Sequence, residues 1–328
     1  MTAVSNFQIA LDGRYIQDHF PGIGRYTFNL IDALARVSSG ERLTVLHNPA
    51  LRNSRYDLAA LARHPNVELQ HTDIPTISLA EQYRLPFAIC NAERQFAIFH
   101  SPYYIKPYFA RVPSVVTIFD LIPLVVPDAV PGAGARLMFR FLAGLAARTS
   151  ARVIAPSSAT RDDLVSRLKV PREKIVVVPL AADTRFAPQP ATELARVREK
   201  YALPSDYILS VGINKPHKNL TTLIEAWQRA DTDTGLVIAG AWDERYAETQ
   251  SAIGNRKTCP EPGEGSKIRF MHNVDDADLP ALYAGATVFV FPSLYEGFGL
   301  PPLEAMACGT PVICSHASSL PELSAMRR

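Results

Sequence analysis

Residues 291–307 read FPSLYEGFGLPPLEAMA, and this stretch combines the end of an apolar strand, a loop with two glycines and the beginning of a helix. Pro301 and Pro302 fit only the first turn of a helix, so they fix where the helix begins. Gly297 and Gly299 lack Cβ atoms, which lets a ligand approach the backbone N–H groups closely. Because a helix N-terminus favours negative charge, the stretch predicts a site for an anion such as a diphosphate.

Two glutamates of the same stretch, Glu296 and Glu304, are the candidate sugar-binding groups. An ionised carboxylate only accepts hydrogen bonds, which suits the hydroxyls of a hexose at Glu296 and a ribose diol at Glu304. Glu304 lies one turn into the expected helix, where the helix dipole stabilises its charge. The alternative is a plain strand-to-helix turn with two surface glutamates. The glycines, the prolines and the sequence CGTPV at residues 308–312 favour the ligand site.

Short apolar strands alternate with helical patterns along the whole chain. In the first half, strands are expected at residues 7–11, 43–47, 96–100, 114–119 and 152–155, with a glycine-rich loop at 21–24 and a helix at 25–37. In the second half, strands are expected at 207–211, 236–239, 268–271, 287–291 and 311–314, and helices at 219–229, 242–253, 278–284 and 302–307. Apolar runs of this length between helices predict parallel sheets covered on both faces.

Prolines between Pro179 and Pro204 mark the join between two α/β domains, with one helix-like run at 192–201. We expect an N-terminal Rossmann-like domain at residues 1–182 and a C-terminal Rossmann-like domain at 183–328. A polar loop is expected at 255–267. After the strand at 311–314 the sequence offers no convincing helix to cover that strand, so the C-terminal domain is expected to be incomplete at its end.

The composition is that of a globular protein, with 47% hydrophobic and 20% charged residues in 328. The 34 basic and 32 acidic residues give a net charge of +2, which is too small for a nucleic-acid surface. The N-terminus lacks a basic segment followed by an apolar run, and no stretch reaches the roughly 18 apolar residues of a spanning helix. We therefore expect a cytoplasmic protein.

Other candidate site residues follow other strands. Lys218 can place a positive charge on a leaving diphosphate, and a solvated lysine is the alternative. Asp120 and His100 follow strands of the first half, and ligands of open α/β sheets bind beyond such strand ends. Asp120 is equally suited to capping a turn, and His100 is slightly better suited to the core.

Together these motifs resemble the retaining glycosyltransferases of family four, whose GT-B fold consists of two facing Rossmann-like domains. The stretch at 291–307 resembles the family's two glutamates separated by seven residues. The likeness extends to LDGR at 11–14, GIGRY at 22–26, VGINKPHKNL at 211–220, and the segments 279–286 and 318–322. It therefore covers nearly the whole chain. Within the family, the chain is similar to bacterial enzymes that build lipopolysaccharide or exopolysaccharide, many of which use GDP-mannose.

The resemblance implies metal-independent, retaining transfer of a hexose, with mannose from GDP-mannose as the expected case, onto a glycan or lipid-linked glycan acceptor. It implies no cofactor. The residues implied to bind the donor are Gly22, Gly24, Lys218, Glu296, Gly297, Phe298, Gly299, Leu300 and Glu304. The residues implied for catalysis are Lys218, Glu296 and Asp120, with His100 and Asp120 on the acceptor side. This chain has His217 where relatives often have Arg, and Phe119 where they often have His.

Two other functions compete with this one. An inactive or truncated GT-B protein, which binds nucleotide sugar without turnover, would account for the expected missing end and for Phe119. An NAD-dependent dehydrogenase is disfavoured, because no strand is followed by Gly-x-Gly-x-x-Gly with an acidic residue about 20 positions later.

Two further patterns suggest surface roles. Asp-x-Asp runs at 231–233 and 276–278 could hold a metal, but the second begins an expected helix, where Asp is a good N-cap. We therefore predict no metal site. Four arginines fall on related positions of an apolar helical stretch: Arg136, Arg140, Arg148 and Arg152. We expect this helix to cover the sheet with its arginine stems along the surface. The alternative is peripheral contact with the cytoplasmic face of the inner membrane.

Overall fold

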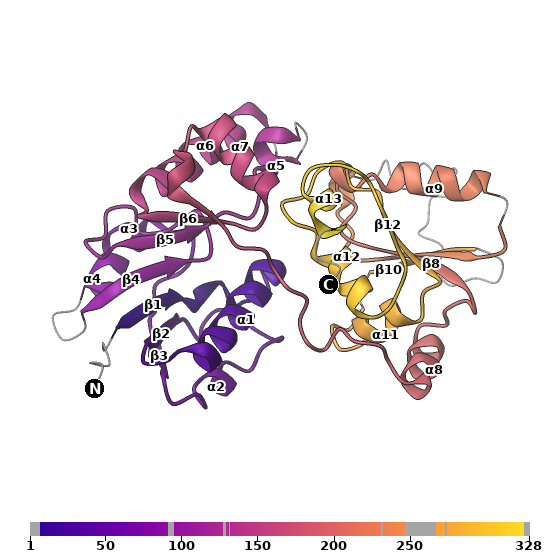
Figure 1. Cartoon of the computed structure of the whole chain (residues 1–328), viewed down its shortest axis with the longest axis horizontal. Helices are drawn as coiled ribbons and strands as arrows, with labels where there is room; N and C mark the ends of the chain where they lie inside the picture. Colours follow the sequence, from indigo (N-terminus) through magenta and orange to yellow (C-terminus); the bar gives the residue numbers. More distant parts are fainter. Residues whose placement is uncertain are drawn as a thin grey trace. The chain divides into compact units, whose positions relative to one another are not determined.

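A computed structural model describes residues 7–90, 95–126, 129–130, 132–230, 232–246, 267–272 and 274–324. The chain divides into two units, and Figure 1 shows that each has a sheet with helices around it. The first unit contains Met1–Phe119, Ala133–Pro156 and Arg161–Val178. The second contains Asp120–Gly132, Ser157–Thr160 and Pro179–Arg328. Two short segments from the first half of the sequence therefore belong to the second unit.

The first unit is built on a seven-stranded parallel sheet in the order β3-β2-β1-β4-β5-β6-β7. The strands are β1 (Gln8–Asp12), β2 (Arg42–His47), β3 (Val67–His71), β4 (Phe96–Ser101), β5 (Ser114–Thr117), β6 (Arg152–Ala155) and β7 (Ile175–Val177). Five of them are the predicted strands, with ends that differ by at most two residues. The sequence pattern misses the two edge strands, because β3 carries polar residues and β7 is only three residues long.

Helices cover both faces of this sheet. They are α1 (Pro21–Val37), α2 (Leu58–Leu61), α3 (Leu79–Tyr83), α4 (Leu85–Ile89), α6 (Gly132–Thr149) and most of α7 (Ser158–Leu168); α5 (Ile122–Val125) falls in a segment of the second unit. Leu11 of β1 packs in a cluster with Ile31 of α1, whereas the preceding Ala10 packs in a cluster with Leu85 and Ile89 of α4. Consecutive residues of a strand point to opposite faces, so α1 and α4 lie on opposite sides of the sheet.

The glycine-rich loop predicted at residues 21–24 is wrong, because these residues form the first turn of α1. Pro21 begins the helix, and its fixed φ suits that position. Gly24 lies against the preceding turn, since a Cβ there would be 3.1 Å from the backbone oxygen of Tyr15. A Cβ on Gly22 would meet no atom within 4 Å. Gly24 is therefore small for packing, and nothing in the first unit requires Gly22.

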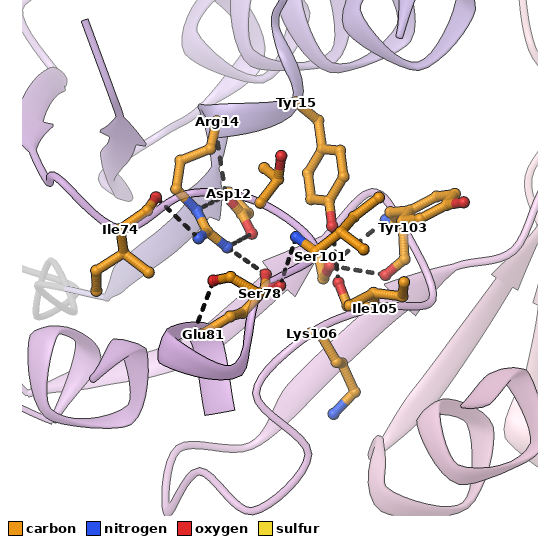
Figure 2. A network of polar contacts seen from close by, with 12 residues as sticks. Asp12, Arg14, Tyr15, Ile74, Ser78, Glu81, Ser101, Tyr103, Ile105 and Lys106 are labelled. Carbon is orange, nitrogen blue, oxygen red and sulfur yellow. Dashed lines mark hydrogen bonds and ion pairs between the residues drawn. The ribbon is translucent and has the colours of Figure 1, made fainter. Parts of the chain in front are cut away.

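A buried group of charges holds the end of β1, as Figure 2 shows. The guanidinium of Arg14 pairs with Asp12 (Nη2 to Oδ2, 2.7 Å) and with Glu81 of α3 (Nη2 to Oε1, 2.5 Å), and all three side chains are 0% exposed. Arg14 Nη1 also donates to the carbonyl of Ile74 at 3.4 Å. Burial raises the pKa of Glu81 to about 7. Two carboxylates thus share one guanidinium, and this cluster links β1 to the chain around residues 74–81.

The second unit is built on a five-stranded parallel sheet in the order β10-β9-β8-β11-β12. The strands are β8 (Tyr207–Val211), β9 (Gly235–Ala239), β10 (Ile268–Met271), β11 (Val288–Phe291) and β12 (Val312–Cys314). Among the described residues after position 190, the α-helices are α8 (Ala191–Lys200), α9 (Leu220–Arg229), α11 (Leu279–Ala284), α12 (Leu300–Ala307) and α13 (Leu320–Leu323). In Figure 1, α9 lies on one side of this sheet and α8 and α11 on the other. The predicted strands are confirmed within one residue at each end.

One prediction for this unit is wrong, and two others fall largely outside the described residues. The helix expected at 242–253 is described only as far as Tyr246, where a 3₁₀ turn covers Glu244–Tyr246. The predicted polar loop at 255–267 lies outside the described residues, apart from its last residue. A helix does follow β12, because Leu320 and Leu323 of α13 are buried in the core of the unit. The sequence hides this helix because it has only four residues and begins next to Pro321.

Candidate functional site

Two neighbouring strands of the second unit end at the candidate site. β8 leads into a 3₁₀ turn, Pro216–Lys218, and β11 leads into the loop that precedes α12. β8 and β11 pair side by side in parallel. Their carboxyl ends therefore lie at the same edge of the sheet, where ligands of such sheets bind. The backbone N–H of Leu294 donates to the carbonyl of His217 at 2.7 Å, which links the two loops.

Lys218 and Glu296 form an ion pair at this edge, with 2.6 Å between Nζ and Oε1. Their side chains are 15% and 12% exposed, so the pair is mostly enclosed but reachable. The Lys218 ammonium also lies 5.0 Å from the ring centre of Phe291, the last residue of β11. The sequence assigns Lys218 to the diphosphate and Glu296 to the hexose, and the structure brings these two side chains into contact.

The loop after Glu296 presents free backbone donors. Among the described residues, none accepts a hydrogen bond from the N–H groups of Gly297, Phe298 or Gly299. Gly299 has φ of +112°, and a Cβ there would approach Leu320 Cδ2 to 2.8 Å, so this position requires glycine. The loop is followed by the N-terminus of α12 with Leu300 and two prolines. This combination can receive an anion.

Glu304 lies within α12 and is buried. Its Oε2 accepts a hydrogen bond from the hydroxyl of Tyr283 at 3.0 Å. Tyr283 belongs to α11, so this contact ties α12 to its neighbour in the core. Glu296 and Glu304 are therefore both turned away from bulk solvent, and neither is the surface glutamate of the alternative interpretation.

Asp120 belongs to the second unit and combines two of the expected features. Its Oδ1 accepts a hydrogen bond from the N–H of Ile122 at 2.9 Å, which is the geometry of a capped turn. Burial raises the pKa of Asp120, the charge of Glu296 raises it further, and the charges of Lys218 and Lys215 lower it. The carboxylate is therefore within electrostatic reach of the Lys218–Glu296 pair.

Lys215 is a residue of this site that the sequence reasoning missed. Its charge lowers the pKa of Asp120 and also that of Asp243. The sequence contains the signal, since Lys215 and Lys218 are three residues apart at the ends of one 3₁₀ turn. His217, between them, is buried, and burial lowers its pKa to about 4. It is therefore neutral near pH 7, and Lys215 is the second cation.

His100, Gly22 and Gly24 lie in the first unit. His100 is buried at the end of β4, where its Nε2 is 2.8 Å from the hydroxyl of Thr117. Burial lowers the pKa of His100 to about 4. Its surroundings are those of a core histidine, and a contact with acceptor stays a prediction. A contact of Gly22 and Gly24, in α1, with the donor likewise stays a prediction.

The Asp-x-Asp runs form ion pairs with basic residues. Asp278 does not cap α11 through its side chain as expected, because its carboxylate is bound by Arg196, Lys200 and Tyr201. Asp233 pairs with Lys267 at 2.7 Å, and Asp231 lies outside the described residues. Within the described part of the chain, no group of three or more His, Cys, Asp or Glu side chains could hold a metal ion.

The arginine-bearing helix is α6, whose buried residues are Phe139, Ala143, Gly144, Ala146 and Ala147. Arg152 is not part of it, because it begins β6. Leu137, Met138 and Phe141 of α6 are exposed. None of the helices among the described residues has the length and apolar character needed to cross a bilayer.

Comparisons with known proteins define the class. The fold is GT-B: sucrose-phosphate synthase from Thermosynechococcus elongatus matches with a TM-score of 0.69 at 22% identity, over 96% of this chain and 82% of that chain. The family model described as "Glycosyltransferase Family 4" matches residues 21–186. The family model described as "Glycosyl transferases group 1" matches residues 193–327. The chain belongs to glycosyltransferase family 4 and is a glycosyltransferase. The predicted fold class and family resemblance are confirmed.

Two curated relatives are bacterial mannosyltransferases. O-antigen chain mannosyltransferase B of Escherichia coli is 32% identical over 321 residues, which cover 92% of this chain and 80% of that protein. O-antigen chain mannosyltransferase RfbU of Salmonella typhimurium is 29% identical over 205 residues, covering 62% of this chain and 52% of that protein. These relatives give no support to the alternative of an inactive protein.

Proposed function

We propose that this glycosyltransferase transfers mannose from GDP-mannose to a glycan or lipid-linked glycan of the bacterial surface, with retention at the anomeric carbon. Two relatives named O-antigen chain mannosyltransferases support the sugar and the class of acceptor. The observation that carries the proposal is the Lys218–Glu296 ion pair beside three free N–H groups. A cation next to backbone donors suits a diphosphate, and the carboxylate suits sugar hydroxyls.

The groups of this site divide the work between donor diphosphate and hexose. Lys218, Lys215, the loop N–H groups and the N-terminus of α12 neutralise the diphosphate as it leaves. Lys218 exchanges its contact with Glu296 for a phosphate oxygen when donor binds. Glu296, and Asp120 near it, then accept hydrogen bonds from the hexose. Glu304 holds the ribose.

The transfer step needs no protein nucleophile. The bond between the anomeric carbon and the diphosphate oxygen breaks, and the acceptor hydroxyl oxygen bonds to the same face of that carbon. The proton of the hydroxyl passes to an oxygen of the leaving diphosphate, so no side chain has to act as base. We propose that neither a metal nor a cofactor takes part. We also propose that the enzyme works at the cytoplasmic face of the inner membrane, with exposed residues of α6 as a peripheral contact.

The test is a thermal-shift screen of the full chain with GDP-mannose, UDP-glucose and ADP-glucose, followed by transfer of radiolabelled mannose to an acceptor glycan. We expect GDP-mannose to raise the Tm most, because a ligand of the folded form alone stabilises it. We also expect label in the acceptor. No rise with any nucleotide sugar would contradict a donor site, and a rise without transfer would contradict the proposed reaction.

A further inference from the structure

Side-chain hydroxyls bind the carbonyl groups of the loop that follows Lys218's partner Glu296. Ser157 and Thr160, at the start of α7, donate to the carbonyl of Gly297 at 2.7 and 3.0 Å. Both residues are buried. Ser157 Oγ also accepts from the N–H of Thr160 at 3.0 Å, so the same side chain caps α7. Two hydroxyls at the start of one helix thus fix a single peptide of the loop.

Two serines before α13 bind the carbonyls on either side. Ser318 and Ser319 donate to the carbonyl of Glu296 at 2.6 and 2.9 Å. The single hydroxyl proton of Ser319 is shared with the carbonyl of Phe298, whose oxygen lies 2.8 Å from Oγ. Ser319 is buried, so water cannot easily take its place and loss of these bonds costs free energy.

Because a peptide bond is planar, a hydrogen bond that holds its carbonyl also fixes the direction of its N–H group. In a trans peptide the N–H points away from the carbonyl of the preceding residue. The carbonyls of Glu296, Gly297 and Phe298 are held by hydroxyls, so the N–H groups of Gly297, Phe298 and Gly299 are turned the other way. These are the three N–H groups that lack an acceptor among the described residues.

The two hydroxyl-bearing segments are also joined to each other. Glu322 of α13 accepts hydrogen bonds from the N–H groups of Ser158 and Ala159, each at 2.9 Å. The carboxylate therefore sits at the N-terminus of α7, where the helix dipole favours it. Each loop carbonyl is thus held by groups that are themselves fixed, which limits rotation of its peptide plane.

We propose that Ser157, Thr160, Ser318 and Ser319 are positioning residues of the donor site, which hold the N–H groups of residues 297–299 toward the donor diphosphate. The inference rests on the proposed function, because it takes the diphosphate as the ligand of those N–H groups. A preorganised set of donors binds an anion without first losing the freedom of the loop. The hydroxyls act through the backbone and do not touch the donor.

The test measures GDP binding by calorimetry and the Tm of the full-length variants. Thr160→Val removes a hydroxyl and keeps the shape, Thr160→Ser keeps the hydroxyl, and Ser319→Ala removes the hydroxyl that two loop carbonyls share. Ser150→Ala is the matched control, because Ser150 is a buried serine of the first unit that donates to the carbonyl of Ala146 at 2.8 Å. We expect Thr160→Val and Ser319→Ala to raise the Kd for GDP about fivefold to thirtyfold, with Thr160→Ser and Ser150→Ala within about twofold of wild type.

A purely structural role would lower the Tm of Ser319→Ala and Ser150→Ala alike and leave the Kd for GDP unchanged, and that result overturns the inference. If Ser319→Ala does not fold, the contrast between Thr160→Val and Thr160→Ser decides in the same way. Wild-type protein that binds no nucleoside diphosphate would contradict the proposed function together with the inference. Wild type that binds GDP, with variants that bind it equally well, would contradict the inference alone.

Discussion

Each unit carries a cluster of opposite charges at the end of its third strand in sheet order. In the first unit, Asp12 ends β1, Arg14 follows it and Glu81 belongs to α3, and their side chains are 0% exposed. In the second unit, Lys218 and Glu296 follow β8 and β11, and their side chains remain 15% and 12% exposed. β1 and β8 each lie where the chain reverses its direction of travel across the sheet, which is the usual ligand position of such folds.

The two clusters differ in how many hydrogen-bonding groups they leave available for a ligand. The guanidinium of Arg14 is bound by two carboxylates and two backbone carbonyls, so it has no capacity for a ligand. Within the described part of the chain, Lys218 has one carboxylate partner, and the N–H groups of the neighbouring loop have no acceptor. Topology alone therefore does not define the site. A functional cluster at this position is distinguished by partly accessible charges and free backbone donors.

The largest expected effect is on stability in the first unit. Arg14→Met leaves two buried carboxylates without their cation, and we expect the free energy of unfolding to fall by about 3–5 kcal/mol. Urea denaturation, followed at the transition in which the first unit unfolds, measures this fall in the free energy of unfolding. Lys267→Met is the control, since it breaks an exposed pair with Asp233 and should change stability by less than about 1 kcal/mol. GDP affinity of the folded Arg14→Met protein should equal that of wild type, and a loss would contradict a purely structural cluster.

The next effect is on turnover in the second unit. Glu296→Gln removes the carboxylate proposed to hold the hexose, and we expect transfer of mannose to fall about a hundredfold. GDP should bind the variant as well as wild type or more tightly, because Lys218 loses its competing carboxylate. Radiolabelled transfer and calorimetry measure the two quantities. Equal losses in both would show that Glu296 serves the diphosphate part of the donor.

A smaller effect concerns one buried histidine in each unit. Burial lowers the pKa of His100 and of His217 from 6.5 to about 4. The unfolded state therefore binds more protons between these values, and each histidine reduces stability as the pH falls from about 6.5 to about 4, by at most roughly 3 kcal/mol. His217→Gln and His100→Gln should each lose less stability than wild type over that range in urea titrations. Glu81 acts with the opposite sign, because its pKa is raised to about 7 and its contribution is lost as the pH rises through that value.

An unchanged acid dependence in His217→Gln would contradict a buried neutral imidazole in the second unit. The same result in His100→Gln would contradict it in the first.

The smallest effects separate the two glycines of α1. Gly24→Ala places a Cβ 3.1 Å from a backbone oxygen and should lower the free energy of unfolding by about 1 kcal/mol. Gly22→Ala meets no atom and should be neutral or stabilise by about 0.5 kcal/mol. Thermal unfolding measures the stability of both variants, and titration with GDP measures their affinity for the nucleotide. A tenfold loss of GDP affinity in Gly22→Ala would instead support the predicted donor role of Gly22.

The sequence allowed good prediction of strands that are mostly apolar and poor prediction of polar or very short elements. β8 is predicted with the observed bounds because its residues are mostly apolar, whereas β3 carries polar residues. The loop at 21–24 was misread because glycines also occur in helices where a neighbour lies close, as at Gly24. α13 was missed because four residues carry no helical period.

The candidate site was predictable where its residues are adjacent in sequence. The glycines and prolines of residues 296–304 predict a loop and the start of a helix without information from the rest of the chain. The contact between Lys218 and Glu296 was not predictable from spacing, because it depends on the pairing of β8 with β11. Lys215, by contrast, lies three residues before Lys218, so its spacing was visible in the sequence. The hydroxyls that hold the loop come from residues about 20 and 140 positions away, and only the folded chain brings them there.

The most direct test of the donor site is calorimetric titration of GDP into wild type, Lys218→Ala and Lys267→Ala. Lys267 is the matched control, a lysine of the same unit in an ion pair with Asp233. We predict that Lys218→Ala binds GDP at least about tenfold more weakly than wild type, because a charged contact to phosphate is lost, and that Lys267→Ala binds it equally well. Equal affinity of all three proteins would contradict a diphosphate site at Lys218.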